Sequence, residues 1–264
     1  MSLLRFLGRV LFLSLLSCPI SFAQHIFING NVLSAQDQFS EAFVTLNERF
    51  IYVGTNEGAL SYQTAKSELT DLKGKTVIPG LIDSHMHAIR AGLHFTHEMS
   101  LEGTKSIKEA LKRIHGESKR LKPNQWIIIA GGWSELQFEE KRRFTQLELQ
   151  SVARGHPFYI QLNYSAVLLS PGALNRLNLK SRLELLSSLK VETLPNGKES
   201  GWLSGSSRAI SQVFDLLPKP TLKSQIKSSL SFFDELIKLG LTGVIDPGGY
   251  NLSLEAYRPI LELN

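Results

Sequence analysis

The sequence predicts an α/β fold in which strands and helices alternate, preceded by a region of short strands. After Pro79-Gly80, short apolar strands alternate with amphipathic helices, a pattern typical of parallel βα units. Before that point, residues 24–76 hold only short apolar runs separated by turn residues. This pattern favours short antiparallel strands, too few to form a stable domain alone.

The N-terminal region supplies the first predicted strands. Residues 25–33 place apolar residues on both sides of Asn29-Gly30, a tight-turn pair. Residues 42–53 predict a strand, a turn at 47–49 and a second strand. Residues 71–78 close this region.

Capping boxes and one glycine mark the helices that follow. Ser106 and Glu109 form the first box, and Thr145 and Glu148 form the second. A third helix, over residues 222–237, has apolar residues at helical spacing, and the glycine at 240 ends it. Strands are predicted around these helices at residues 81–87, 126–130, 157–162 and 241–246, and the one at 126–130 is of the buried type.

The composition excludes several classes of protein. The 264 residues are 42% hydrophobic and 20% charged, which is ordinary for a globular protein. The 29 Lys and Arg against 24 Asp and Glu give a net charge of only +5, so we predict no nucleic-acid partner. No apolar run after the N-terminus is long enough to span a bilayer, so no stable membrane span is predicted.

Residues 1–23 predict a secretory signal peptide. A basic start, an apolar core and a small-residue cleavage site follow one another, at Arg5 and Arg9, Val10–Leu16 and Ser21–Ala23. We therefore expect an exported protein, periplasmic or secreted. A signal anchor is one alternative, and a lipid anchor through Cys18 is another, because residues 16–18 faintly resemble a lipoprotein cleavage box.

His85 and His87 are the sharpest candidates for metal ligands. Side chains two residues apart on a strand point to one face, so both imidazoles could reach one metal ion, zinc in particular. The strand is apolar, follows Pro79-Gly80 and carries Asp83 on the same face. The sequence therefore predicts a metal site at the end of this strand.

Residues 77–87, with the sequence VIPGLIDSHMH, resemble the signature of the metal-dependent amidohydrolase superfamily. More narrowly, the chain is similar to the amidohydrolase 3 family of YtcJ-like proteins, with supporting stretches at residues 130–133, 169–174 and 240–249. The resemblance implies a (β/α)8 TIM-type barrel, here incomplete, over residues 77–264. It also implies that residues 24–76 are the first half of a small β-sandwich.

The same resemblance implies a metal-dependent hydrolase that cleaves C–N bonds in small non-peptide amides or related groups. Zinc or another divalent metal would activate water, and the hydroxide would attack the carbonyl carbon. No His follows His156, so the two later His and the Asp of the family's metal set would lie beyond Asn264. We therefore expect an N-terminal fragment, with open barrel edges that could pair in a homo-oligomer.

Three further side chains are candidates for substrate contacts. Trp133 follows a strand and two glycines, which fits either a pocket wall or the core. Asp246 ends a strand where loops build the site, or it serves as a turn residue. Tyr164 stands where the family has a His, and Gly205 where a Glu is expected; these departures indicate either a subgroup with different substrate contacts or relaxed constraint.

His94 and His97 follow the motif on a predicted helix. For both, a solvated helical face is favoured over the mouth of the site.

Three functions stay open from the sequence. The chain is part of an active amidohydrolase, an inactive truncated remnant, or an exported binding protein on the same scaffold. Because two His bind zinc weakly compared with a four-ligand site, we expect little or no hydrolase turnover from this chain by itself.

Overall fold

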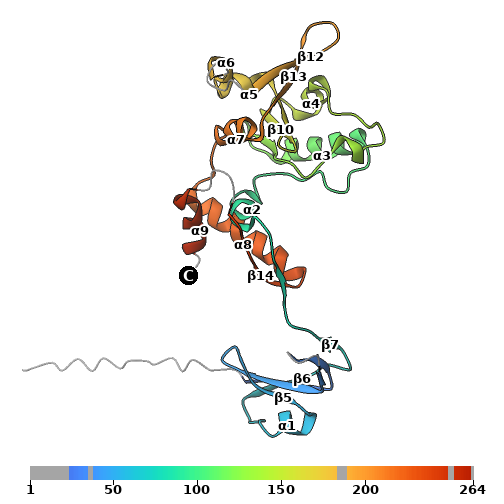
Figure 1. The fold of residues 1–264 in the computed structure, drawn as a ribbon, viewed down its shortest axis with the longest axis vertical. Coiled ribbons are helices and arrows are strands. Elements are labelled where there is room, and N and C mark those ends of the chain that lie inside the picture. Colours follow the sequence, from blue (N-terminus) through green and yellow to red (C-terminus); the bar gives the residue numbers. More distant parts are fainter. Residues whose placement is uncertain (1–23, 35–37, 183–188, 249–252, 263–264) are drawn as a thin grey trace, which may run out of the picture. The chain divides into compact units, whose positions relative to one another are not determined.

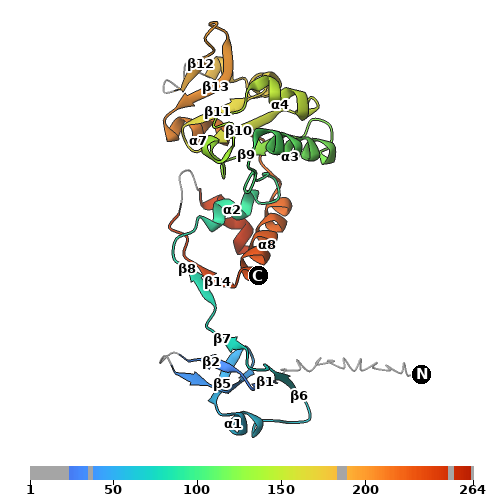
Figure 2. The ribbon, with the colours of Figure 1, turned by 90° about the vertical axis from the view of Figure 1, so that its right-hand side faces the viewer.

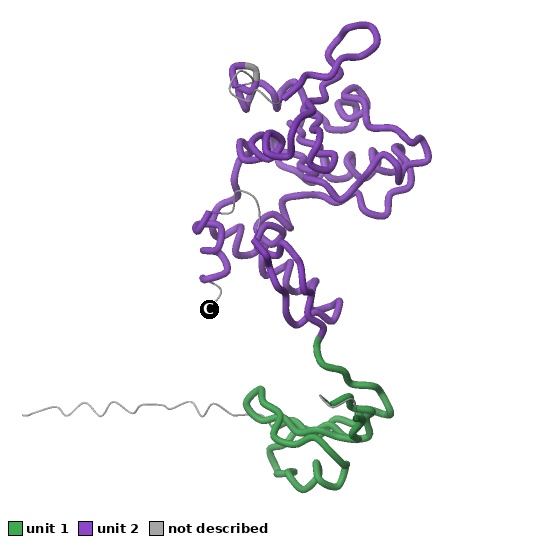
Figure 3. Tube along the Cα trace, viewed as in Figure 1, with its two compact units in different colours: residues 1–80 green, residues 81–264 purple. Residues whose placement is uncertain are grey.

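The computed structural model describes residues 24–34, 38–182, 189–248 and 253–262. The chain divides into two compact units, residues 1–80 and 81–264, which Figure 3 colours separately. The predicted signal peptide and Cys18 lie outside the described residues. Among the described helices, none combines the length and the apolar character needed to cross a membrane.

The first unit contains two small sheets (Figure 2). A four-stranded sheet has the order β5-β4-β1-β6, and a three-stranded sheet has the order β3-β2-β7. The strands are β1 (Gln24–Ile28), β2 (Asn31–Leu33), β3 (Phe39–Ser40), β4 (Ala42–Leu46), β5 (Arg49–Gly54), β6 (Ser67–Asp71) and β7 (Thr76–Val77). The short helix α1 (Asn56–Leu60) contributes Ala59 to the core of this unit, beside Ile26, Ala42 and Val44.

The turns of the first unit lie where the sequence predicts them, but the direction of some strand pairs differs from the prediction. Asn47 and Glu48 both have positive φ (51° and 60°), which closes the predicted β4–β5 hairpin. Asn29 (φ 55°) passes the chain from β1 into β2, which belongs to the other sheet. The prediction of antiparallel strands was wrong for two pairs, because β1–β6 and β2–β7 are parallel. Both are joined by the long crossovers that parallel pairing requires.

The second unit contains a parallel pair, β8 (Leu81–Asp83) and β14 (Leu241–Val244). Helix α2 (Ala88–His94) follows β8, helix α8 (Leu222–Lys238) precedes β14, and the two helices pack together. Gly92 permits this close packing, since a Cβ there would lie 3.3 Å from the Cα of Ser229. These elements form one βαβ crossover with a whole sheet inserted in its middle.

The inserted part is a five-stranded sheet of order β12-β13-β11-β10-β9 (Figure 1). Its strands are β9 (Ile127–Ile129), β10 (Phe158–Leu162), β11 (Ala166–Leu169), β12 (Leu189–Thr193) and β13 (Glu199–Gly205). Its helices are α3 (Ile107–Arg120), α4 (Gln146–Ala153), α5 (Pro171–Arg176), α6 (Leu179–Arg182) and α7 (Ser207–Asp215). Outside the insert, the described chain ends in the short helix α9 (Arg258–Leu261).

The inserted sheet is covered on both faces. Phe158 and Ile160 of β10 point into a core with α3 and α4, which holds Trp133, Phe138 and Phe144. The alternate residue Tyr159 points into a second core with α5 and α7. This alternation along one buried strand gives a three-layer α/β/α arrangement.

Within the described residues, no further strand joins the two-stranded sheet of β8 and β14. The strands predicted at 126–130 and 157–162 exist as β9 and β10 and are parallel to each other, but they belong to the inserted sheet. The expectation of parallel units was wrong for β11, β12 and β13, whose pairings are antiparallel. The incomplete barrel stays a prediction.

The capping box of Thr145 and Glu148 makes the stability of the fold depend on pH. Arg142 donates to both carboxylate oxygens of Glu148, at 2.7 and 3.0 Å, and lowers the pKa of Glu148 to about 2, with help from the Thr145 N–H and hydroxyl. This pKa lies below the ordinary value of 4.5, so the ionised form stabilises the fold above about pH 4.5. That contribution is lost as the pH falls toward 2.

We expect Glu148→Gln to lower the free energy of unfolding by about 0.5 kcal/mol at pH 7, because Gln keeps the cap and loses the charge. Denaturant titrations should show the variant and the wild type converging between pH 4.5 and 2. Glu235→Gln, which removes a single exposed ion pair with Lys238, is the control and should change stability less. A constant difference down to pH 2 would contradict this account.

Candidate functional site

His85 and His87 lie just beyond the end of β8. The prediction that both stand on the strand was wrong, because β8 ends at Asp83, whose carboxylate accepts the N–H of His85 at 2.9 Å. His87 occupies the N-cap position of α2. The two imidazoles are nevertheless neighbours, with ring centroids 5.6 Å apart and planes at 76°.

Strand β14 brings Asp246 to the same place. Because β8 and β14 are adjacent and parallel, the segments that follow them emerge at one edge of the sheet. Asp246 Oδ1 lies 3.9 Å from His87 Nδ1, and Oδ2 accepts the N–H of Ile89 at 2.8 Å. Oδ1 also accepts the N–H of Gly248 at 2.8 Å, so Asp246 serves as a turn residue while facing the His pair.

The chemistry of this cluster suits part of a metal site. Two adjacent imidazoles are typical zinc ligands, and zinc commonly takes three or four protein ligands. Within the part of the chain that the structure describes, no group of three or more His, Cys, Asp or Glu side chains is arranged to hold a metal ion. The residue types of His85 and His87 therefore suit a divalent metal such as zinc.

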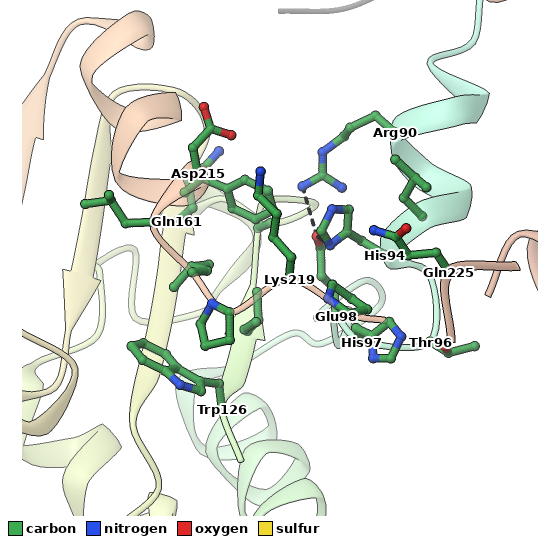
Figure 4. A pocket seen from close by; sticks show the side chains of 18 of the residues that line it. Arg90, His94, Thr96, His97, Glu98, Trp126, Gln161, Asp215, Lys219 and Gln225 are labelled. Carbon is green, nitrogen blue, oxygen red and sulfur yellow. Dashed lines mark hydrogen bonds and ion pairs between the residues drawn. The ribbon is translucent and has the colours of Figure 1, made fainter. Parts of the chain in front are cut away.

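A cavity of about 1640 Å³ opens beside the His pair. Figure 4 shows part of its lining, including Arg90, His94 and Glu98. Residues of α2 and α8 line one wall, and residues of α7 and the inserted sheet line the other. Both imidazoles of the pair are in this lining. Polar side chains from both walls face the cavity, among them Arg90, His94, His97, Glu98, Gln161, Tyr164 and Lys219.

Arg90, His94 and Glu98 form a network at the α2 wall. Arg90 Nη2 donates to Glu98 Oε1 at 2.9 Å, and the same oxygen lies 3.6 Å from His94 Nδ1. The Arg90 guanidinium also lies over the ring of Phe214, 4.7 Å from its centroid, and the His94 ring meets Phe214 edge-on. Phe214 belongs to α7, so this contact joins the two walls.

Burial sets the protonation of this network. Burial is the main cause that lowers the pKa of His94 to about 4, and the charges of Arg90, His97 and Lys219 contribute to the same shift. Burial raises the pKa of Glu98 even though Arg90 opposes that change. His94 is therefore neutral at physiological pH.

The favoured interpretation of His94 and His97 was wrong. The His94 side chain is only 19% exposed, and both residues line the cavity. His97 Nε2 lies 3.0 Å from Ser224 Oγ of α8, and burial lowers the pKa of His97. For His94 the signal was the spacing of His87, Arg90 and His94, three and four residues apart, which places them on one side of a helix. The prediction that His97 stands on this helix was wrong, because α2 ends at His94.

Of the candidate substrate contacts, Trp133 lies in the core. Its side chain is 4% exposed, its Nε1 donates to the carbonyl oxygen of Gln161 at 2.8 Å, and its ring packs against Phe138 and Phe144. Tyr164 lines the cavity from the turn between β10 and β11. Gly205 ends β13, and its N–H donates to the carbonyl oxygen of Ser165.

Comparisons with curated proteins give relatives along most of the chain. An N-substituted formamide deformylase from Arthrobacter pascens is 25% identical over 239 residues, which cover 88% of this chain and 44% of that protein. A putative amidohydrolase, YtcJ, from Bacillus subtilis is 28% identical over 100 residues, covering 38% of this chain and 18% of that protein. This chain spans less than half the length of these relatives.

Two solved structures share the fold. They are uncharacterized metal-dependent hydrolases from Pyrococcus horikoshii and Pyrococcus furiosus, with TM-scores of 0.60 and 0.63 and identities of 21% and 23%. Each covers 91% of this chain, and this chain covers 45% and 47% of theirs. The sequence model described as "Amidohydrolase family" matches residues 68–264, more than half of the chain. The chain therefore belongs to the amidohydrolase family.

Proposed function

We propose that this chain carries part of the active site of a metal-dependent hydrolase that cleaves C–N bonds in small non-peptide amides. The observation that carries the proposal is the pair of adjacent imidazoles, His85 and His87, at the edge of a large cavity. Membership of the amidohydrolase family and the likeness to a formamide deformylase support this class of reaction.

His85 and His87 would hold a divalent metal, which we propose to be zinc. When bound, such a metal supplies Lewis acidity and water that ionises near neutral pH. The other ligands would come from outside the described residues. Further chain, as in the longer relatives, is our first proposal for their source, and a second copy of the chain is the alternative.

The exposed edge of the β8–β14 pair supports completion of the site by added strands. Leu81 and Ile82 of β8 are 51% and 66% exposed, and Ile245 after β14 is 57% exposed. Apolar side chains on a two-stranded sheet usually pack against further structure. We propose that an incomplete barrel is extended here, within a longer chain or in a homo-oligomer.

The cavity would hold the substrate. Arg90 has its orientation set by Glu98 and Phe214, so its donors are presented in a defined geometry. The neutral imidazole of His94 and the hydroxyl of Tyr164 add polar groups that suit an uncharged amide. Trp133 lies in the core, so its role is to support the wall through Gln161.

A second function is favoured by one observation. The described residues present a large cavity but no set of three metal-binding side chains. An inactive remnant, or a binding protein that uses the cavity without the reaction, would have this combination. Metal binding by the His pair separates these functions from the hydrolase.

Metal binding is the direct test of the proposed site. We expect His85→Ala and His87→Ala each to weaken Zn²⁺ binding by at least tenfold, because each removes one of two imidazole ligands. Isothermal titration of the full chain measures this. His115→Ala is the control, since His115 contacts the carbonyl oxygen of Val152 instead. Wild-type affinity in the double His85 and His87 variant would contradict the proposal.

Hydrolysis of an N-substituted formamide, assayed in parallel, tests the expectation of a partial site. Zinc-loaded full chain alone should turn over slowly or not at all. Robust turnover would show that this chain already holds a complete site.

The His94 pKa of about 4 predicts that the free energy of unfolding falls in acid. Its ordinary value is 6.5, so the unfolded chain binds the proton first, and stability falls as the pH drops from about 6.5 toward 4. The loss should be roughly 2–3 kcal/mol by pH 4. In denaturant titrations His94→Gln should lack this part of the pH dependence, whereas the control His25→Gln should keep it. Parallel curves for wild type and His94→Gln would overturn this prediction.

We also propose export to the periplasm or the medium, supported by the basic and apolar pattern of residues 1–23. The intact mass of the native protein from cell fractions should correspond to a mature chain that starts at Gln24. A lipid-modified start at Cys18 would instead indicate anchoring. A chain that starts at Met1 in the cytoplasmic fraction would contradict export.

A further inference from the structure

The described contacts of the Asp246 carboxylate are with two backbone N–H groups near the His pair and with the imidazole of His87. Its carboxylate accepts the N–H groups of Ile89 and Gly248, each at 2.8 Å, and Oδ1 lies 3.9 Å from His87 Nδ1. The Asp246 side chain is 13% exposed, whereas that of His87 is 52% exposed. A largely buried carboxylate thus lies next to a more exposed imidazole.

Helix α2 depends on this carboxylate for its cap. His87 occupies the N-cap position but makes no side-chain cap hydrogen bond. The first N–H groups of a helix need an acceptor, which a side chain at the N-cap commonly provides. Asp246 provides it to Ile89 from 157 residues further along the chain. The position of His87 is therefore tied to the end of β14.

We propose that Asp246 is a positioning residue for His87, an inference that rests on the proposed metal-dependent function. By capping the first turn of α2, Asp246 sets the place of the His87 backbone. By facing Nδ1, it favours the imidazole tautomer with the proton on Nδ1 and leaves the Nε2 lone pair for the metal. The neighbouring Pro247 and Gly248, which line the cavity, form the wall at this point.

Glu140 offers a matched comparison within the same chain. Its Oε2 accepts the N–H of Ile107, the first residue of α3, at 3.0 Å from 33 residues away. Within the described residues, Glu140 forms no ion pair with an imidazole, unlike Asp246. Both carboxylates cap a helix from a distance, and only one of them faces a candidate metal ligand.

The test compares the full chain with Asp246→Asn, Asp246→Ala and Glu140→Ala. Zn²⁺ affinity is measured by competition with a chromophoric chelator, and stability by the thermal midpoint. Asp246→Asn should bind Zn²⁺ at least tenfold more weakly, with a smaller fall in the midpoint than Asp246→Ala, because its one amide oxygen can still accept the Ile89 N–H although its NH2 cannot accept the Gly248 N–H. Asp246→Ala should show the same loss and a midpoint lower by about 2–4 °C. Glu140→Ala should lower the midpoint and keep wild-type affinity.

Two results would overturn the inference. One is wild-type Zn²⁺ affinity in Asp246→Asn, and the other is an equal loss of affinity in Glu140→Ala. If the wild type binds no Zn²⁺, the proposed function fails and a metal-free measurement decides the inference. In ¹⁵N–¹H imidazole spectra, His87 should carry its proton on Nδ1 and shift toward Nε2 in Asp246→Ala, with His85 unchanged. An unchanged His87 tautomer would refute the positioning role.

Discussion

The parallel pairing of β8 with β14 is the constraint on which the candidate site depends. These strands are joined by a connection that contains the five-stranded inserted sheet and its helices. Their pairing places Asp246 beside His87. The packing of α2 against α8 forms the wall of the cavity that contains Arg90 and His94. Without this one pairing, the residues of the site would belong to separate parts of the chain.

The inserted sheet has two apolar cores of its own. Its two cores hold large apolar side chains, and Trp133 and Tyr159 are almost completely buried in them. Burial of this extent stabilises the sheet independently of the polar cavity. The cavity can therefore hold polar and titratable groups, which contribute less to folding than apolar residues of the same volume would.

Charge in the cavity is controlled by burial rather than by ion pairing alone. Arg90 pairs with Glu98, yet burial still raises the pKa of Glu98, and the pKa of His94 falls. Arg90 and His94 both contact the ring of Phe214, which provides apolar surface beside the two groups. The proposed amide substrate would meet oriented donors here, such as the Arg90 guanidinium that Glu98 holds.

The sequence by itself determined the local elements and the family. The N-cap at Ser106, the capping box at Thr145, the turn at Asn47 and the glycine stop at Gly240 depend on neighbouring residues, so they could be predicted without the fold. The second half of the box predicted at Ser106 does not form, because the Glu109 carboxylate accepts the N–H of Lys105 instead. The motif that contains His85 and His87 indicated the family for the same local reason. Only the tertiary structure decided which strands pair, that His94 is buried and that Trp133 lies in the core. Those outcomes depend on contacts between distant segments, such as Asp246 with Ile89 and Phe214 with Arg90, which local sequence patterns do not encode.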